Sequence, residues 1–145
     1  MSRKPESSVD QPQGEARLGY TLVCDDVRLE AGNKMSLMGL FRNIVLPGLP
    51  ASVIRFAILN HWEGEGAFES DIRVLGPGGA ELLRSKPSRF SIQAGGFADN
   101  VTFFTNVTFR EEGVHTIQIA LSGRVVSELP VAVHVQQAPP KGTVN

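Results

Sequence analysis

The stretch Phe68-Glu69-Ser70-Asp71-Ile72-Arg73-Val74 decides the fold class of this chain. Apolar residues occupy its first, fifth and seventh positions, and charged residues occupy its second, fourth and sixth positions. Side chains alternate between the two faces of a β-strand, so this pattern places one face in a core and the other in water. The turn signal Gly76-Pro77-Gly78-Gly79 follows directly. The stretch therefore predicts a half-buried strand of an antiparallel sheet.

The same period-two pattern recurs on both sides of this stretch, with turn signals between the repeats. The predicted strands cover residues 18–24, 35–41, 53–62, 68–74, 89–93, 101–109, 116–121 and 129–135, and residues 81–84 pair briefly. The connections are too short for crossover helices, so the sheets should be antiparallel. We predict an all-β fold, an antiparallel immunoglobulin-like β-sandwich of about eight strands, with jelly-roll and barrel variants left open. Pro130 lacks an amide hydrogen, which predicts an edge or a bend in the last strand at that position.

The ends of the chain differ in composition from its middle. Residues 1–16 are polar, contain two prolines, and have almost no large apolar side chains, which predicts a flexible arm. Residues 137–145 are predicted to form a second, shorter flexible tail. The 145 residues fit one domain, so we expect a single β-sandwich domain over residues 17–136.

Composition narrows the classes of partner and compartment. The formal net charge of −1 gives no basic surplus, so we expect no nucleic-acid partner. No apolar run approaches the ~20 residues that span a bilayer, so we expect no membrane partner. The single cysteine, Cys24, allows no intrachain disulfide, and the first residues lack the apolar core of a secretory signal. Together these features predict a cytoplasmic protein.

Several motifs resemble a known family. Residues 24–30 (Cys-Asp-Asp-Val-Arg-Leu-Glu), followed by a turn and by residues 37–41 (Leu-Met-Gly-Leu-Phe), resemble the opening of a family of uncharacterised bacterial β-sandwich proteins. Residues 113–117, 122–124 and 129–131 are similar to the final hairpin of many immunoglobulin-like domains. The resemblance covers most of residues 18–135 and implies the fold. The family has no assigned activity, so the resemblance implies no catalytic residue and no ligand.

Two groups of side chains are candidates for a metal or small-ligand site. His61, Glu63 and Glu65 are spaced so that an extended segment would place all three on one face, where a divalent ion could bind. The alternative is that Glu63 and Glu65 belong to a solvated loop. Asp25 and Asp26, together with Glu30, Asp99 and Asn100, offer oxygen ligands for calcium. The alternative here is an aspartate that accepts backbone hydrogen bonds at a strand end.

The sequence contains no recognisable nucleophile with an adjacent base. Cys24 alternates in phase with apolar residues, which predicts a buried thiol. His115 is predicted to be packed or hydrogen-bonded, and His134 to face outward. We therefore expect no enzymatic activity and no cofactor.

Phe104 is the candidate interface residue. Alternation along residues 101–109 groups Phe103 with Val101 and Val107, so Phe103 is expected in the core and Phe104 on the outer face. A large exposed aromatic side chain can anchor an interface. The alternatives are a β-bulge that turns both rings inward, or cover by the N-terminal arm. The sequence thus favours a protein-binding or self-associating module, with a protein partner or a homodimer, over a metal- or ligand-binding domain.

Overall fold

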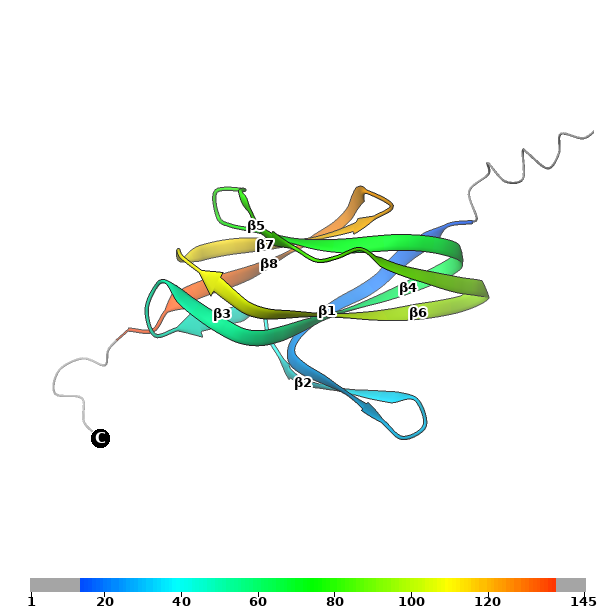
Figure 1. Cartoon of the computed structure of the whole chain (residues 1–145), viewed down its shortest axis with the longest axis horizontal. Coiled ribbons are helices and arrows are strands. Elements are labelled where there is room, and N and C mark those ends of the chain that lie inside the picture. The colour runs from blue at the N-terminus through cyan, green and yellow to red at the C-terminus, as the bar shows by residue number, and fades with distance from the viewer. Residues whose placement is uncertain (1–13, 138–145) are drawn as a thin grey trace, which may run out of the picture.

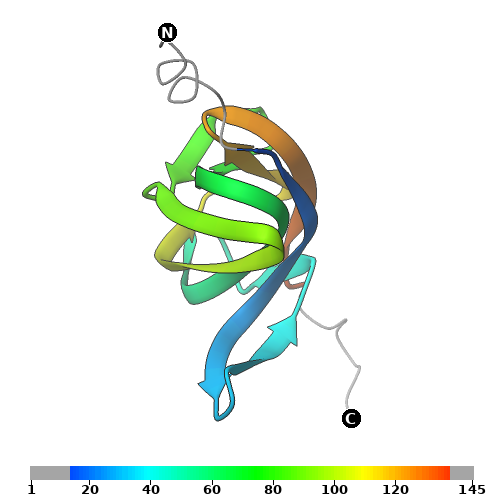
Figure 2. The same cartoon turned by 90° about the vertical axis from the view of Figure 1, so that its right-hand side faces the viewer.

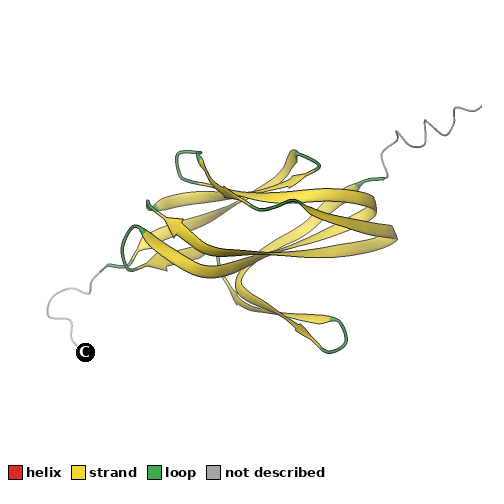
Figure 3. Ribbon diagram, in the orientation of Figure 1, coloured by secondary structure: helices red, strands yellow, loops and turns green. Residues whose placement is uncertain are grey.

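The computed structural model of the chain describes residues 14–137 and contains β-strands and no helix over that range (Figure 3). The strands are β1 (Ala16–Glu30), β2 (Lys34–Leu40), β3 (Asn43–Leu46), β4 (Ala51–Leu75), β5 (Glu81–Arg84), β6 (Ser88–Phe109), β7 (Gly113–Leu121) and β8 (Arg124–Val135). The predicted all-β fold class is confirmed. No helix in the described part of the chain is long and apolar enough to cross a membrane.

Two of the strands are much longer than the sequence pattern predicted. The predicted strands 53–62 and 68–74 are parts of the single strand β4, and 89–93 and 101–109 are parts of β6. β4 and β6 pair along nearly their whole length, with one register shift between Gly64 and Gly66. Glycine tolerates the backbone torsions that such a shift requires, and Gly64 and Gly66 both have positive φ. The two strands therefore curve together without ending (Figure 1).

This curvature folds one hydrogen-bonded sheet of eight strands into two layers. The first, called here the β1 layer, contains β2, β1, residues 51–64 of β4 and residues 96–109 of β6. The second, called the β7 layer, contains the rest of β4 with β5, the start of β6, and then β7, β8 and β3. The hairpin of β1 and β2 extends beyond the body of the molecule (Figures 1 and 2).

The core lies between the layers and receives side chains from both. Phe56, Ile58 and Trp62 of the β1 layer and Ile72 and Ile119 of the β7 layer belong to one buried apolar cluster. None of these five side chains is more than 3% exposed. Because neither layer has a separate core, the described residues form one packing unit.

One strand pair departs from the predicted antiparallel arrangement. β3 pairs with β8 in parallel, and the other pairs are antiparallel. A parallel pair needs a long connection, and the connection here consists of β4 to β7, whereas the prediction considered only neighbouring strands. The prediction for Pro130 is confirmed, since β8 pairs with β3 only from Ala132 onward and has a free edge at Pro130.

A kink in β4 and β6 reverses the predicted faces of Phe103 and Phe104. Asn106 has a φ of 53°, and Thr105 and Asn106 both point outward, so the alternation changes phase there. Phe104 is consequently buried (7% exposed) and Phe103 is exposed (44%). The prediction that Phe104 lies on the outer face was wrong, because a left-handed residue had been read as regular strand.

The N-terminal boundary of the folded region lies slightly before the predicted one. β1 begins at Ala16, which pairs with Gly64, and the carbonyl of Glu15 accepts a hydrogen bond from the amide of Glu65 at 3.0 Å. Ala16 is therefore part of the sheet, and Glu15 is hydrogen-bonded to it. Residues 1–13 of the predicted arm and residues 138–145 of the predicted tail lie outside the described residues.

Candidate functional site

The outer face of the β1 layer is built by alternate residues of three neighbouring strands. Val23 of β1 and Ile58 of β4 point into the core, so their neighbours along each strand point outward. The outward rows are Tyr20–His61–Asp99, Leu22–Leu59–Val101 and Cys24–Ala57–Phe103. Leu59 is 3% exposed although it is not part of the central core, which shows how closely these outward side chains pack against each other.

Large apolar side chains remain exposed on this surface. We call the surface formed by Tyr20, Leu22, Leu40, Phe97, Val101 and Phe103 the aromatic face. Its most exposed members are Phe97 (63%), Leu40 (60%), Tyr20 (46%) and Phe103 (44%). Leu40 joins it because β2 pairs Leu40 with Cys24. Contiguous exposed apolar surface is uncommon on monomeric proteins and often marks a site of interaction.

His61 lies in the middle of a row of rings. Its imidazole stacks on Tyr20 of β1, with centroids 4.6 Å apart and planes 4° apart. Phe97 of β6 approaches from the other neighbouring strand, with centroids 5.2 Å apart. The guanidinium of Arg55 lies 4.7 Å from the ring centroid of Phe103, further along the same face. Each exposed ring of the aromatic face therefore contacts a neighbouring side chain on that face.

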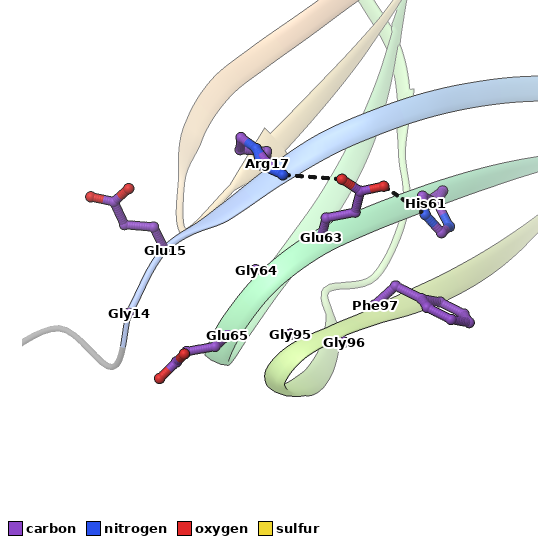
Figure 4. A pocket seen from close by; sticks show the side chains of 10 residues that line it. All are labelled: Gly14, Glu15, Arg17, His61, Glu63, Gly64, Glu65, Gly95, Gly96 and Phe97. Carbon is purple, nitrogen blue, oxygen red and sulfur yellow. Dashed lines mark hydrogen bonds and ion pairs between the residues drawn. The ribbon is translucent and has the colours of Figure 1, made fainter.

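Charged groups at the end of the aromatic face are paired with each other. Nδ1 of His61 lies 2.6 Å from a carboxylate oxygen of Asp99, and its Nε2 lies 3.3 Å from a carboxylate oxygen of Glu63. Glu63 also accepts a hydrogen bond from Arg17 at 3.0 Å (Figure 4). Arg17, His61 and Glu63, together with Gly64, Gly95 and Gly96, line an open groove beside Phe97. Glu15 and Glu65 also line the groove, so its carboxylates outnumber the single guanidinium of Arg17.

The predicted metal ligands His61, Glu63 and Glu65 do not converge. Glu63 and Asp99 approach opposite nitrogens of the His61 ring, so they share no point at which an ion could bind all three groups. The register shift between Gly64 and Gly66 turns Glu65 away from His61 (Figure 4). Over residues 14–137 no group of three or more His, Cys, Asp or Glu side chains is placed to hold a metal ion. The expectation of one shared face fails because the strand is irregular at these glycines.

The predicted calcium ligands are also engaged separately. Asp26 forms an ion pair with Arg55 and accepts a hydrogen bond from the amide of Val27 at 2.9 Å. The hydrogen bond from Arg55 holds the pKa of Asp26 below its ordinary value. Glu30 accepts a hydrogen bond from the hydroxyl of Ser36 at 2.8 Å. The backbone hydrogen bond of the predicted alternative is present at Asp26, but Asp26 lies inside β1 and not at a strand end.

Asp99 and Asn100, the other two calcium candidates, point to opposite faces of β6. Asp99 is on the outer face with His61, whereas Asn100 pairs with buried Asn60 and donates to the hydroxyl of Ser88 at 3.2 Å. They therefore cannot bind one ion together with Asp26.

Cys24, His115 and His134 occupy the environments that the sequence predicted. Cys24 is fully buried, and burial raises the pKa of its thiol. His115 is 1% exposed, and its Nδ1 donates to the carbonyl of Gly113 at 3.1 Å. His134 is exposed and lies 3.4 Å from the side-chain oxygen of Asn43. Among the described residues, the hydrogen-bond partners of the three histidines are carboxylates, a backbone carbonyl and an amide oxygen, and none is a serine or cysteine that a histidine could activate as a nucleophile.

The outer face of the β7 layer has a different character. Its central row contains Arg73, Gln118 and Glu128 on three adjacent strands. Arg73 donates to Asp71 at 3.2 Å, and Gln118 donates to Glu128 at 2.7 Å. This row is typical of the outer face of a β-sandwich, and the exposed apolar residues beside it, Val114 and Val45, are aliphatic. Exposed aromatic side chains therefore distinguish the outer face of the other layer.

The sequence of this domain matches one family model. Residues 19–134 match the model of a family of unknown function, DUF6941. The chain belongs to that family. The predicted membership of an uncharacterised β-sandwich family is thereby confirmed. The matched range contains every member of the aromatic face, so that face is part of the DUF6941 domain itself. No protein of curated function matches the sequence.

Solved structures resemble the DUF6941 domain in fold. A β-glucosidase from Listeria innocua in complex with glucose has a TM-score of 0.54 at 12% identity, over 83% of this chain and 16% of the glucosidase. The alkylpurine DNA glycosylase AlkC from Pseudomonas fluorescens, bound to DNA containing an abasic site analog, has a TM-score of 0.51 at 11% identity, over 88% and 32%. An immunoglobulin-like protein from Pseudomonas aeruginosa has a TM-score of 0.44 at 14% identity, over 84% and 98%.

The chain therefore spans a small part of the first two proteins. At these identities the likeness shows the fold alone.

The sequence did not predict the aromatic face. Regular alternation places Phe103 on the same face as Val107 and Phe109, but the kink at Asn106 puts Phe103 on the opposite face. Asn106 was the available signal, since asparagine is depleted in strands and enriched at positive φ.

Proposed function

We propose that this DUF6941 domain is a non-enzymatic module that binds a protein through the aromatic face. The observation that carries the proposal is the exposure of Tyr20, Phe97 and Phe103 on one outer sheet face, whereas the exposed apolar residues of the opposite outer face are aliphatic, such as Val45 and Val114. Aromatic side chains are enriched at the centres of protein interfaces because they bury a large area at a small cost in side-chain entropy.

The charges around the aromatic face support a protein partner. Arg17 is paired with Glu63, Arg55 with Asp26, and His61 with Asp99. A face with paired charges offers no basic surplus for a phosphate backbone, which favours a protein over a nucleic acid. It also fits the polar rim that surrounds the apolar centre of a typical interface.

The environments of the ionisable side chains support a non-enzymatic role. Cys24 is buried, and its thiol is held away from the thiolate form by desolvation. Both nitrogens of His61 already face carboxylates, and His115 is enclosed in the core. A general base requires a nitrogen that can reach a substrate or a nucleophile, which none of these positions offers.

The proposal is tested by affinity capture from a lysate of the native host, with Phe97→Asp and Phe103→Asp beside the wild type. Val126→Asp is the matched control, because Val126 is a similarly exposed apolar residue in the β7 layer. A protein that is captured by the wild type and the control should then bind the purified domain at least about tenfold more weakly when either phenylalanine is replaced. Capture that is indifferent to both replacements would contradict the proposal.

A further inference from the structure

The second half of β6 has an unpaired edge. Residues 96–109 pair with β4 on one side, and within residues 14–137 no strand pairs with them on the other. The amide and carbonyl groups that point to that side therefore lack a partner in the sheet. Such a row of free groups is a template for an additional strand.

This edge carries few of the features that usually prevent strand addition. Natural edge strands are short, or they carry charges, prolines or bulges. Residues 97–109 contain one charged residue, Asp99, and no proline or glycine, and are rich in valine, threonine and phenylalanine. The other free edges are short or carry such features. β3 and β5 have four residues each, and β2 has seven, beginning with Lys34. The unpaired stretch of β1 (residues 16–22) contains Arg17 and Gly19, and that of β8 (residues 124–131) contains Arg124, Glu128 and Pro130. The kink at Asn106 limits the regular part of the β6 edge to residues 97–104.

The aromatic face continues to this same edge. Phe97, Val101 and Phe103 are its members on β6, and all three point outward beside the free backbone groups. A strand that paired with β6 would therefore extend the sheet and also place its own side chains against these residues. The edge and the face together form one continuous surface.

We propose that residues 97–104 pair antiparallel with the same residues of a second copy of this chain. This rests on the proposed function and names the second copy as the partner. A two-fold axis places identical strands against each other, and the only charged residue in the segment is Asp99. An axis at Val101 puts Asp99 opposite Phe103 and the two copies of Val101 opposite each other, so no like charges meet. The aromatic faces of the two copies then form one uninterrupted surface.

The first test uses the wild-type full chain and requires no variant. Sedimentation velocity over a concentration series should show conversion of monomer to dimer. Amide hydrogen exchange, measured by NMR at both ends of that series, should show that alternate amides of residues 97–104 become protected as the dimer forms. Only the amides that face away from β4 should change, because the others already bond within the sheet.

The second test compares two lysine substitutions in one row of the aromatic face. Val101→Lys places a charge beside the free edge, and Leu22→Lys places the same charge two strands away. Two facing lysines should weaken the Val101→Lys dimer by at least about a hundredfold, because like charges in an interface cost several kcal/mol. The Leu22→Lys dimer should stay within about threefold of the wild type, and circular dichroism shows that both variants are folded.

Two results would overturn the edge pairing. A monomer at every concentration would exclude a second copy as the partner, and the capture experiment above would then decide the role of the aromatic face separately. A dimer that both lysines weaken equally, with unchanged exchange in residues 97–104, would show contact through the face without strand addition. The proposed function would survive that result, and the edge pairing would not.

Discussion

Phe103 and Phe104 are adjacent residues with opposite environments, so they form a matched pair at the residue scale. Phe104 packs in the core against Phe56, with ring centroids 5.3 Å apart, whereas Phe103 is half exposed beneath Arg55. Phe104→Ala should lower the free energy of unfolding by about 3–5 kcal/mol, because it leaves a cavity. Phe103→Ala should cost at most about 1 kcal/mol, the loss of an exposed cation–π contact. Urea denaturation measures both values, and equal losses would contradict the kink at Asn106.

The ion pair between Asp26 and Arg55 should make stability depend on pH. Arg55 holds the pKa of Asp26 below its ordinary value in the folded chain. A lowered folded-state pKa stabilises the fold above the unfolded pKa of about 4, and that contribution disappears as pH falls through the folded pKa. Asp26→Asn should therefore be less stable than the wild type at pH 7, and the difference should shrink below about pH 4.

Arg55→Gln provides the control for this pH dependence. This substitution removes the other member of the same ion pair. Its stability deficit at pH 7, relative to the wild type, should therefore also shrink in acid. Adding Asp26→Asn to Arg55→Gln should have little further effect on the pH profile, because the interaction is already lost. Urea midpoints between pH 3 and 7 give the profile. A deficit that is constant with pH would contradict the role of the ion pair.

At the scale of the element, the alternation of apolar and polar residues located nearly every strand. It did not show that two pairs of predicted strands are continuous, as β4 and β6. Residues 68–74 alternate cleanly and lie within β4, and residues 117–121 lie within β7 as predicted. The pattern could not show that β4 continues through Gly64 and Gly66, since glycines usually end a strand and here permit a change of register. Asn106 had the same effect on β6, because one left-handed residue moves all later side chains to the other face.

Gly64 is the glycine at which this joining of elements can be tested. It has a φ of 139°, and a Cβ there would collide with the backbone carbonyl of Glu15, where β1 enters the sheet. Gly64→Ala should cost more than about 1 kcal/mol, because alanine tolerates neither the torsion nor the contact. Gly78→Ala is the control, since a Cβ there meets nothing within 4 Å, and its effect should stay within about 1 kcal/mol. Thermal unfolding distinguishes them, and a neutral Gly64→Ala would contradict the close approach.

At the scale of the whole molecule, the sequence predicted the fold class and not the candidate site. Each strand can be predicted from its own residues, because the side chains that it buries are apolar and recur at every second position. The aromatic face depends on which residues of β1, β4 and β6 share a row, for example Leu22, Leu59 and Val101. Row membership depends on pairing between residues far apart in the chain, which periodicity in one strand does not contain.

The joining of the two layers through β4 and β6 predicts how the molecule unfolds. Because both layers contribute to one core and share two continuous strands, neither should remain folded when the other is lost. Ile58→Ala in the β1 layer and Ile119→Ala in the β7 layer should each lower the free energy of unfolding by about 2–5 kcal/mol. Trp62, the only tryptophan and fully buried, reports on the core by fluorescence, while circular dichroism reports on all strands. In both variants the two probes should give the same urea midpoint. A midpoint that differs between the probes in either variant would show that one layer unfolds separately, in conflict with a single folded sheet.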